Sequence, residues 1–98
     1  MTLPLVLRAE ARAEFDEAFD WYEQQRPGLG LDFMRRVQQA FDLIEQMPEL
    51  HARVFEDVRC ATVRRFPYAV YYRVETDQIV VLAVFHGRRD PKIWQERV

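Results

Sequence analysis

The residues best suited to chemistry lie close together near the carboxyl terminus, where an apolar run ends in His86, Arg88 and Arg89. An imidazole changes charge near neutral pH and can transfer protons, whereas a guanidinium binds phosphate or carboxylate through paired hydrogen bonds. Because Ile79–Phe85 is apolar at every position, it predicts a buried strand that ends at these polar residues. The segment suits a nuclease site, a docking surface for a protein, or a solvated strand end.

Three further arginines, Arg64, Arg65 and Arg73, fall within the strands expected before this one. Neighbouring residues of a strand point to opposite faces, so at most one of Arg64 and Arg65 joins a site with Arg73. Metal-free RNA cleavage needs a base for the 2′-hydroxyl proton, cations for the phosphorane charge and an acid for the leaving oxygen. A nuclease built on this chain would use His86, Arg64, Arg73 and Arg88.

The charge of the chain is divided unevenly along its length. Residues 1–50 carry 5 basic and 10 acidic side chains, and residues 51–98 carry 9 basic and 6 acidic ones, which gives a net charge of −2. The second half is therefore suited to an anionic surface that would repel the first half. The whole chain is too acidic to bind nucleic acid by charge alone, because that mode neutralises several phosphates.

The composition also limits the cofactors and the compartment. Cys60 is the only cysteine, and His51 and His86 are far apart in the sequence, so we expect no disulfide, no metal site and no cofactor. No run approaches the roughly 18–20 apolar residues that span a bilayer, and the amino terminus does not resemble a signal peptide. We therefore expect a cytoplasmic protein with no membrane partner.

Two helices are predicted before the strands. A short strand at 3–8 precedes a helix from Glu10 to about Gln25, with acidic residues, Glu14 among them, on its polar side. Residues 27–30, rich in Pro and Gly, break it. A second helix begins near Asp32 and stops at Pro48. Its apolar face comprises Phe33, Val37, Ala40, Phe41, Ile44 and Met47. Two such helices joined by a short turn predict an antiparallel hairpin.

Three strands, at 60–66, 68–75 and 78–86, are predicted to follow, and the last two are joined by a tight turn. The hairpin should cover one face of their sheet and leave the other partly open. A short carboxyl-terminal helix should pack the ring of Trp94 on the core. The chain is thus expected to be a single α+β domain over residues 1–98, of order β-α-α-β-β-β plus the terminal helix, with a mainly antiparallel sheet.

Several strings of the sequence resemble, in the right order, the RelE/ParE superfamily of toxins from bacterial type II toxin–antitoxin modules. They are Trp21-Tyr22-Glu23, Gly28-Leu29-Gly30 with Phe33, Phe66-Pro67-Tyr68 running into Val70-Tyr71-Tyr72, and Ala83-Val84-Phe85-His86-Gly87-Arg88-Arg89-Asp90-Pro91 with Trp94. Each string is weakly specific alone, but together they span nearly the whole chain. The resemblance implies the compact fold of that superfamily.

The superfamily contains two kinds of toxin. RelE-like members are ribosome-dependent mRNA endonucleases, whereas ParE-like members inhibit DNA gyrase by protein contact. The strings above are more similar to the ParE side. Nuclease members also typically bring several lysines to the active face and a tyrosine close to the carboxyl end, whereas here no lysine lies on that face and Trp94 occupies the end.

The resemblance therefore implies a cognate antitoxin and, as target, DNA gyrase, with the ribosome and its mRNA as the alternative. An inactive relative that only binds its antitoxin is a third possibility. The expected gyrase-binding residues are Arg64, Arg73, His86, Arg88, Arg89 and Trp94. The expected antitoxin-binding residues are Arg65, Tyr71, Arg73 and Trp21, because arginines suit an acidic, partly disordered tail.

Overall fold

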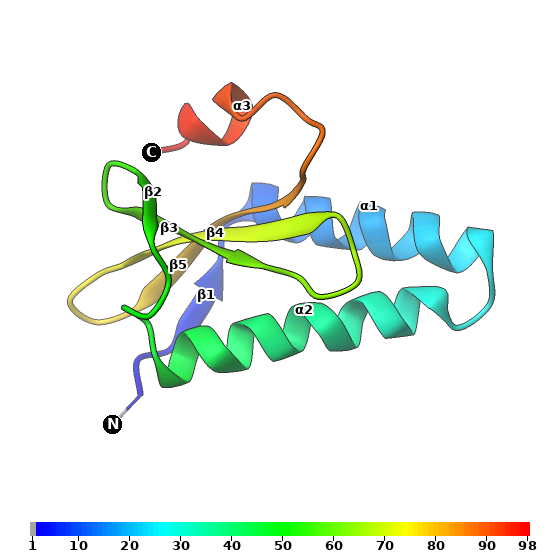
Figure 1. Cartoon of the computed structure of the whole chain (residues 1–98), viewed down its shortest axis with the longest axis horizontal. Coiled ribbons are helices and arrows are strands. Elements are labelled where there is room, and N and C mark those ends of the chain that lie inside the picture. The colour runs from blue at the N-terminus through cyan, green and yellow to red at the C-terminus, as the bar shows by residue number, and fades with distance from the viewer. Residues whose placement is uncertain (1) are drawn as a thin grey trace.

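A five-stranded sheet of order β1-β5-β4-β3-β2 forms the centre of the protein, whose computed structural model describes residues 2–98. The two long helices, α1 and α2, run antiparallel to each other beside the sheet, and α3 lies at the top in Figure 1. The elements are β1 (Leu5–Leu7), α1 (Ala9–Gln25), α2 (Leu29–Gln46), β2 (Arg53–Phe55), β3 (Val58–Thr62), β4 (Tyr68–Val74), β5 (Ile79–His86) and α3 (Lys92–Gln95).

The predicted α+β architecture is confirmed. β1 runs parallel to β5, and all the other strand pairs are antiparallel. β5 lies between β1 and β4, and its residues 79–85 are all buried, as the uninterrupted apolar run predicted. The turn between β4 and β5 is closed by a 2.8 Å hydrogen bond from the Glu75 N–H to the Gln78 carbonyl.

The helical hairpin buries its apolar stripes against one face of the sheet. Phe33, Val37 and Ile44 of α2 are almost fully buried, together with Ala11 and Ala18 of α1. They pack on alternate residues of the strands, so this core lies between the hairpin and the sheet.

The turn between the helices is shorter than the sequence predicted, because α2 already begins at Leu29. The Glu23 side chain stabilises this short turn. Its carboxylate accepts hydrogen bonds from the N–H groups of Gly28 and Gly30, at 3.0 and 2.9 Å, and so satisfies donors at the start of α2. Gly28 has a φ of 89°, a conformation that favours glycine.

A second apolar cluster lies on the opposite face of the sheet. Trp94 of α3 is only 2% exposed, and it packs with Val58, Leu82 and Phe85. Its ring is stacked on Tyr71 with centroids 4.2 Å apart. The predicted packing of Trp94 on the core is confirmed, and the four-residue helix α3 covers part of this face.

The strands before β4 differ from the prediction. A short strand, β2, was not predicted, because it has only three residues and two of them are exposed. The predicted strand at 60–66 is displaced: β3 spans Val58–Thr62, and residues 63–67 form a turn. Arg65 in that turn has a φ of 70°, which is incompatible with a strand.

A buried tyrosine fixes the connection between α2 and β2. The Tyr72 hydroxyl donates to the Pro48 carbonyl at 2.7 Å and lies 3.2 Å from Nδ1 of His51. Arg59 donates to the His51 carbonyl at 2.7 Å. Burial raises the pKa of Tyr72 to about 12, so the hydroxyl keeps its proton at physiological pH.

Candidate functional site

A groove beside the end of β5 gathers several of the predicted site residues. Two adjoining cavities of about 320 and 500 Å³ share Trp21, Tyr68, His86 and Arg89 in their walls. We call these four residues the strand-end groove. Because β4 and β5 pair Tyr68 with His86, and Gly87 donates to the Pro67 carbonyl at 2.8 Å, the turn before β4 is fixed against the end of β5.

His86 is held in one orientation by its neighbours. Its ring meets the Tyr68 ring edge-on, with centroids 5.2 Å apart, and its Nδ1 accepts a 3.0 Å hydrogen bond from the Arg88 backbone N–H. The neutral ring therefore carries its proton on Nε2. A general base must offer an unprotonated nitrogen to its substrate, so the geometry suits His86 to donating a hydrogen bond.

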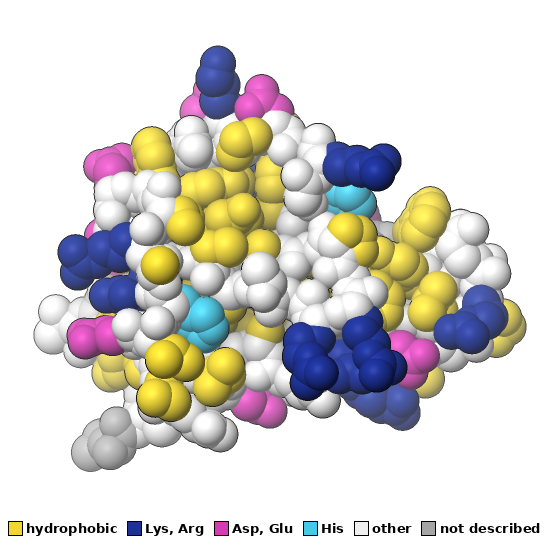
Figure 2. Space-filling view, in the orientation of Figure 1, with side chains coloured by type: hydrophobic (Ala, Val, Ile, Leu, Met, Phe, Trp, Pro, Cys, Tyr) yellow, Lys and Arg dark blue, Asp and Glu magenta, His cyan; other side chains and the backbone are white. Residues whose placement is uncertain are grey.

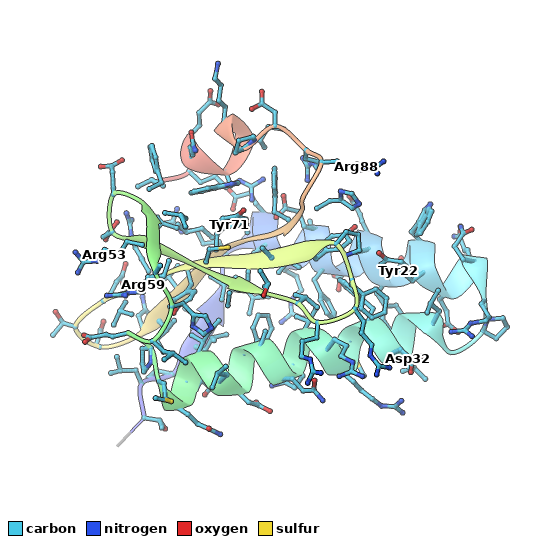
Figure 3. All side chains as sticks on the ribbon, in the orientation of Figure 1. Tyr22, Asp32, Arg53, Arg59, Tyr71 and Arg88 are labelled. Carbon is cyan, nitrogen blue, oxygen red and sulfur yellow. The ribbon has the colours of Figure 1, made fainter. Side chains whose placement is uncertain are left out.

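The two arginines after β5 have different surroundings. Arg88 is exposed and projects from the β5–α3 connection away from the body of the molecule (Figure 3). Arg89 pairs with Glu14 of α1 at 3.1 Å, and its guanidinium lies 4.4 Å from the centre of the Phe85 ring. Arg88 is thus available to a partner molecule, whereas Arg89 also stabilises the fold.

Glu14 and Arg97 are the polar residues near the groove that the sequence argument missed. The Glu14 side chain is 9% exposed and accepts from the Val84 N–H at 3.2 Å and from both terminal nitrogens of Arg97 at 2.9 and 3.0 Å. Arg97 also donates to the Leu82 carbonyl, and its hydrogen bond to Glu14 raises its pKa. The predicted position of Glu14 on the polar side of the helix is wrong. A signal was available, because Glu14 falls at helical spacing between the buried residues Ala11 and Ala18.

Arg73 lies too far from His86 to share a catalytic centre with it. Arg73 lies five positions along β4 from Tyr68, the partner of His86, which corresponds to about 17 Å along a strand. Arg73 instead forms a 2.9 Å ion pair with Asp57 and lowers the pKa of that carboxyl through this hydrogen bond. The predicted grouping of Arg73 with His86 and Arg88 in one catalytic centre is therefore wrong, whereas their grouping in one target-binding surface stays a prediction, because a protein interface is wider than this distance.

Arg64 and Arg65 are both exposed in the turn between β3 and β4. The prediction that they point to opposite faces of a strand is wrong because no strand extends to them. Arg64 lies three residues before Pro67, whose carbonyl accepts a hydrogen bond from the Gly87 N–H, so the turn brings Arg64 to the same end of the sheet as Arg88. Arg65 lines a different cavity, beside α2.

Three aromatic residues were expected at binding surfaces. Trp94 cannot offer its ring to a target because it is buried, so that prediction is corrected. Tyr71 is half-buried with one ring face against Trp94, and burial raises its pKa to about 12. Trp21, by contrast, is 56% exposed at the groove and remains available to a partner.

Within residues 2–98, no three His, Cys, Asp or Glu side chains are grouped so that they could hold a metal ion. The same part of the chain contains no helix whose length and apolar character would let it span a membrane.

Comparison with known proteins identifies one family. The family model described as "ParE toxin of type II toxin-antitoxin system, parDE" matches residues 5–91. Among curated proteins, no sequence relative is found. A solved structure titled "Chromosomal ParDE TA system from P. aeruginosa" superposes with a TM-score of 0.75 and 22% sequence identity, over 86% of this chain and 95% of that one. At this identity the structural match supports the fold.

Proposed function

The chain belongs to the ParE toxin family of type II toxin–antitoxin systems, and from this premise we propose that it inhibits DNA gyrase by protein–protein contact in the cytoplasm. A cognate antitoxin neutralises it. The observation that carries the proposal is the exposed Trp21 in the strand-end groove, together with the exposed Arg88 that follows His86 of that groove by two residues. Tryptophan and arginine are the residue types most enriched at the energetic centres of protein interfaces.

The geometry of the groove is better suited to binding than to RNA cleavage. His86 offers a hydrogen-bond donor through Nε2, because the Arg88 N–H occupies Nδ1. Arg73, the second cation expected for a nuclease, lies about 17 Å along β4 from the residue paired with His86. A phosphorane intermediate needs its cations within hydrogen-bond reach.

We assign Trp21, Arg64, His86 and Arg88 to the gyrase-binding surface. Arg89 stabilises this surface through its ion pair with Glu14. Trp21 also remains a candidate for the antitoxin, so one partner would exclude the other by competing for the same ring. Arg65, Tyr71 and Arg73 remain proposed antitoxin contacts away from the groove. Arg73 forms an ion pair with the exposed Asp57. A carboxylate of a partner protein would compete with Asp57 for the Arg73 guanidinium.

The test is supercoiling by purified gyrase in the presence of the toxin. Wild-type protein should inhibit, and the Trp21→Ala and Arg88→Ala variants should each need about tenfold more protein, as expected for truncating a central interface side chain. Arg53→Ala is the matched control, since Arg53 is exposed at the opposite end of the sheet (Figure 3). The protein encoded by the neighbouring reading frame should restore supercoiling.

Two outcomes would reject the gyrase target. Ribosome-phased cuts in mapped transcripts, abolished by His86→Ala, would establish the endonuclease. Normal growth on expression without the antitoxin, together with unaffected supercoiling, would indicate an inactive relative.

A further inference from the structure

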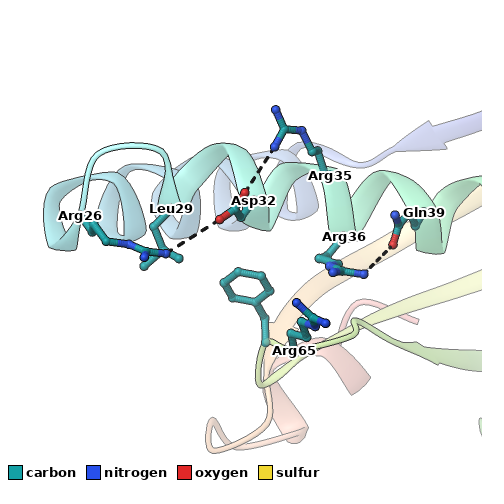
Figure 4. A pocket seen from close by; sticks show the side chains of 8 residues that line it. Arg26, Leu29, Asp32, Arg35, Arg36, Gln39 and Arg65 are labelled. Atoms are coloured by element: carbon teal, nitrogen blue, oxygen red, sulfur yellow. Dashed lines mark hydrogen bonds and ion pairs between the residues drawn. The ribbon is translucent and has the colours of Figure 1, made fainter.

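A second cavity, on the α2 side of the molecule, is lined by arginines from distant parts of the sequence. It has a volume of about 430 Å³, and Arg26, Arg35, Arg36 and Arg65 line it together with Asp32 and the Phe66 ring (Figure 4). We call these six residues the arginine pocket. Figure 2 shows Lys and Arg side chains gathered on one part of this face, over α2 and the neighbouring turn.

The pocket holds more positive charge than the chain itself neutralises. Asp32 lies 3.9 Å from Arg26 and 3.3 Å from Arg35, so these two arginines share one carboxylate. Within residues 2–98, neither Arg36 nor Arg65 has a carboxylate within ion-pairing distance, and Arg36 donates to Gln39. Four guanidinium groups and one carboxylate leave a surplus of three positive charges.

The turn that places Arg65 in the pocket has a strained backbone conformation. Arg65 has a φ of 70°, a conformation that a non-glycine residue adopts only when its surroundings impose it. Phe66 beside it packs edge-on against Tyr22 and Phe33, with ring centroids 4.9 and 5.3 Å away. The aromatic cluster thus fixes the turn that carries Arg65 towards α2.

We propose that the arginine pocket binds a compact ligand with two or more phosphate groups. A carboxylate side chain brings a single negative charge, whereas a diphosphate brings enough to offset the surplus in a volume that this cavity can hold. Guanidinium groups bind phosphate oxygens through paired hydrogen bonds. The same chemistry is offered by a free nucleoside diphosphate or triphosphate and by consecutive phosphates of a nucleic acid. The site is separate from the strand-end groove.

Titration calorimetry at low ionic strength tests the proposal on the full chain. The probes are pyrophosphate, ATP, a short single-stranded DNA and a glutamate-rich peptide. The Arg36→Gln/Arg65→Gln variant should raise the Kd of the phosphate probes about tenfold or more. A matched double variant, Arg12→Gln/Arg53→Gln, removes the same charge from two exposed residues outside the pocket and should change the Kd less than about twofold.

The individual probes distinguish a free phosphate ligand from the phosphates of a nucleic acid. Binding of pyrophosphate and ATP indicates a free phosphate ligand, and binding of the DNA alone indicates a nucleic-acid backbone. The proposal is overturned if no phosphate probe binds, if both double variants weaken binding equally, or if the acidic peptide binds more tightly than pyrophosphate. Unchanged melting temperatures of the variants would show that a loss of binding is not a loss of folding.

Discussion

At the scale of single residues, one hydrogen bond decides how His86 can act. The Arg88 N–H donates to Nδ1 and so fixes the tautomer of the neutral ring, which leaves Nε2 as a hydrogen-bond donor. The residue type and its position after β5 were readable from the sequence. The tautomer was not, because it depends on the backbone course of the two residues that follow.

The second histidine makes the stability of the fold depend on pH. Burial, and then the charge of Arg59, lower the pKa of His51 below its ordinary value of 6.5. The folded state therefore favours the neutral ring, and its contribution to stability is fully present above pH 6.5 and is lost as the pH falls towards the lowered value. Urea unfolding midpoints should decrease between about pH 7.5 and 5.5.

The His51→Asn variant isolates this effect, because the amide keeps a donor near the Tyr72 hydroxyl but does not titrate. Its midpoint should decrease less than that of the wild type over the same interval. An equal decrease in both proteins would assign the pH dependence to other groups.

At the scale of elements, the close approach of α1 and α2 depends on a glycine. A Cβ at Gly30 would lie 2.8 Å from the Phe19 carbonyl oxygen and 2.9 Å from a Glu23 carboxylate oxygen. We expect Gly30→Ala to lower the free energy of unfolding by about 1–3 kcal/mol, although alanine favours helix. Denaturant unfolding measures the change.

Gly87 provides the control for this substitution. A Cβ there would meet only the Pro67 carbonyl oxygen, at an ordinary 3.7 Å. Gly87→Ala should therefore stay within about 0.5 kcal/mol of the wild type. If both variants unfolded alike, steric crowding between the helices would not be the cause.

Some of the helices and strands could be predicted from the sequence, and others could not. Helical spacing located the buried stripe of α2, and the apolar run located β5, because each pattern reports burial of one element against its neighbours. β2 gave no such pattern, since two of its three residues are exposed. The arginine pocket was equally hidden: Arg26, Arg35 and Arg36 lie in the half of the chain expected to repel anions, and only folding brings them to Arg65.

At the scale of the whole molecule, Glu14 ties the carboxyl-terminal segment to α1 and β5. We expect Glu14→Ala to lower the free energy of unfolding by about 2–4 kcal/mol, because it leaves Arg97, whose side chain is only 13% exposed, without its anion. Asp16→Ala, at an exposed position on the same helix, should cost less than about 0.5 kcal/mol. Thermal or urea unfolding compares them, and similar losses would show that the ion pair adds little.

The Glu14 and Arg97 contacts also determine how the sheet can meet other chains. β1 pairs only with Ile79–Val81, so the rest of β5 would present a bare sheet edge to a second copy of the protein. Glu14 takes the N–H of Val84 and Arg97 takes the carbonyl of Leu82, which removes two of the groups that an added strand would need. A strand could extend the sheet there only by displacing both side chains. The protein is therefore protected against edge-to-edge aggregation on this side by an ion pair.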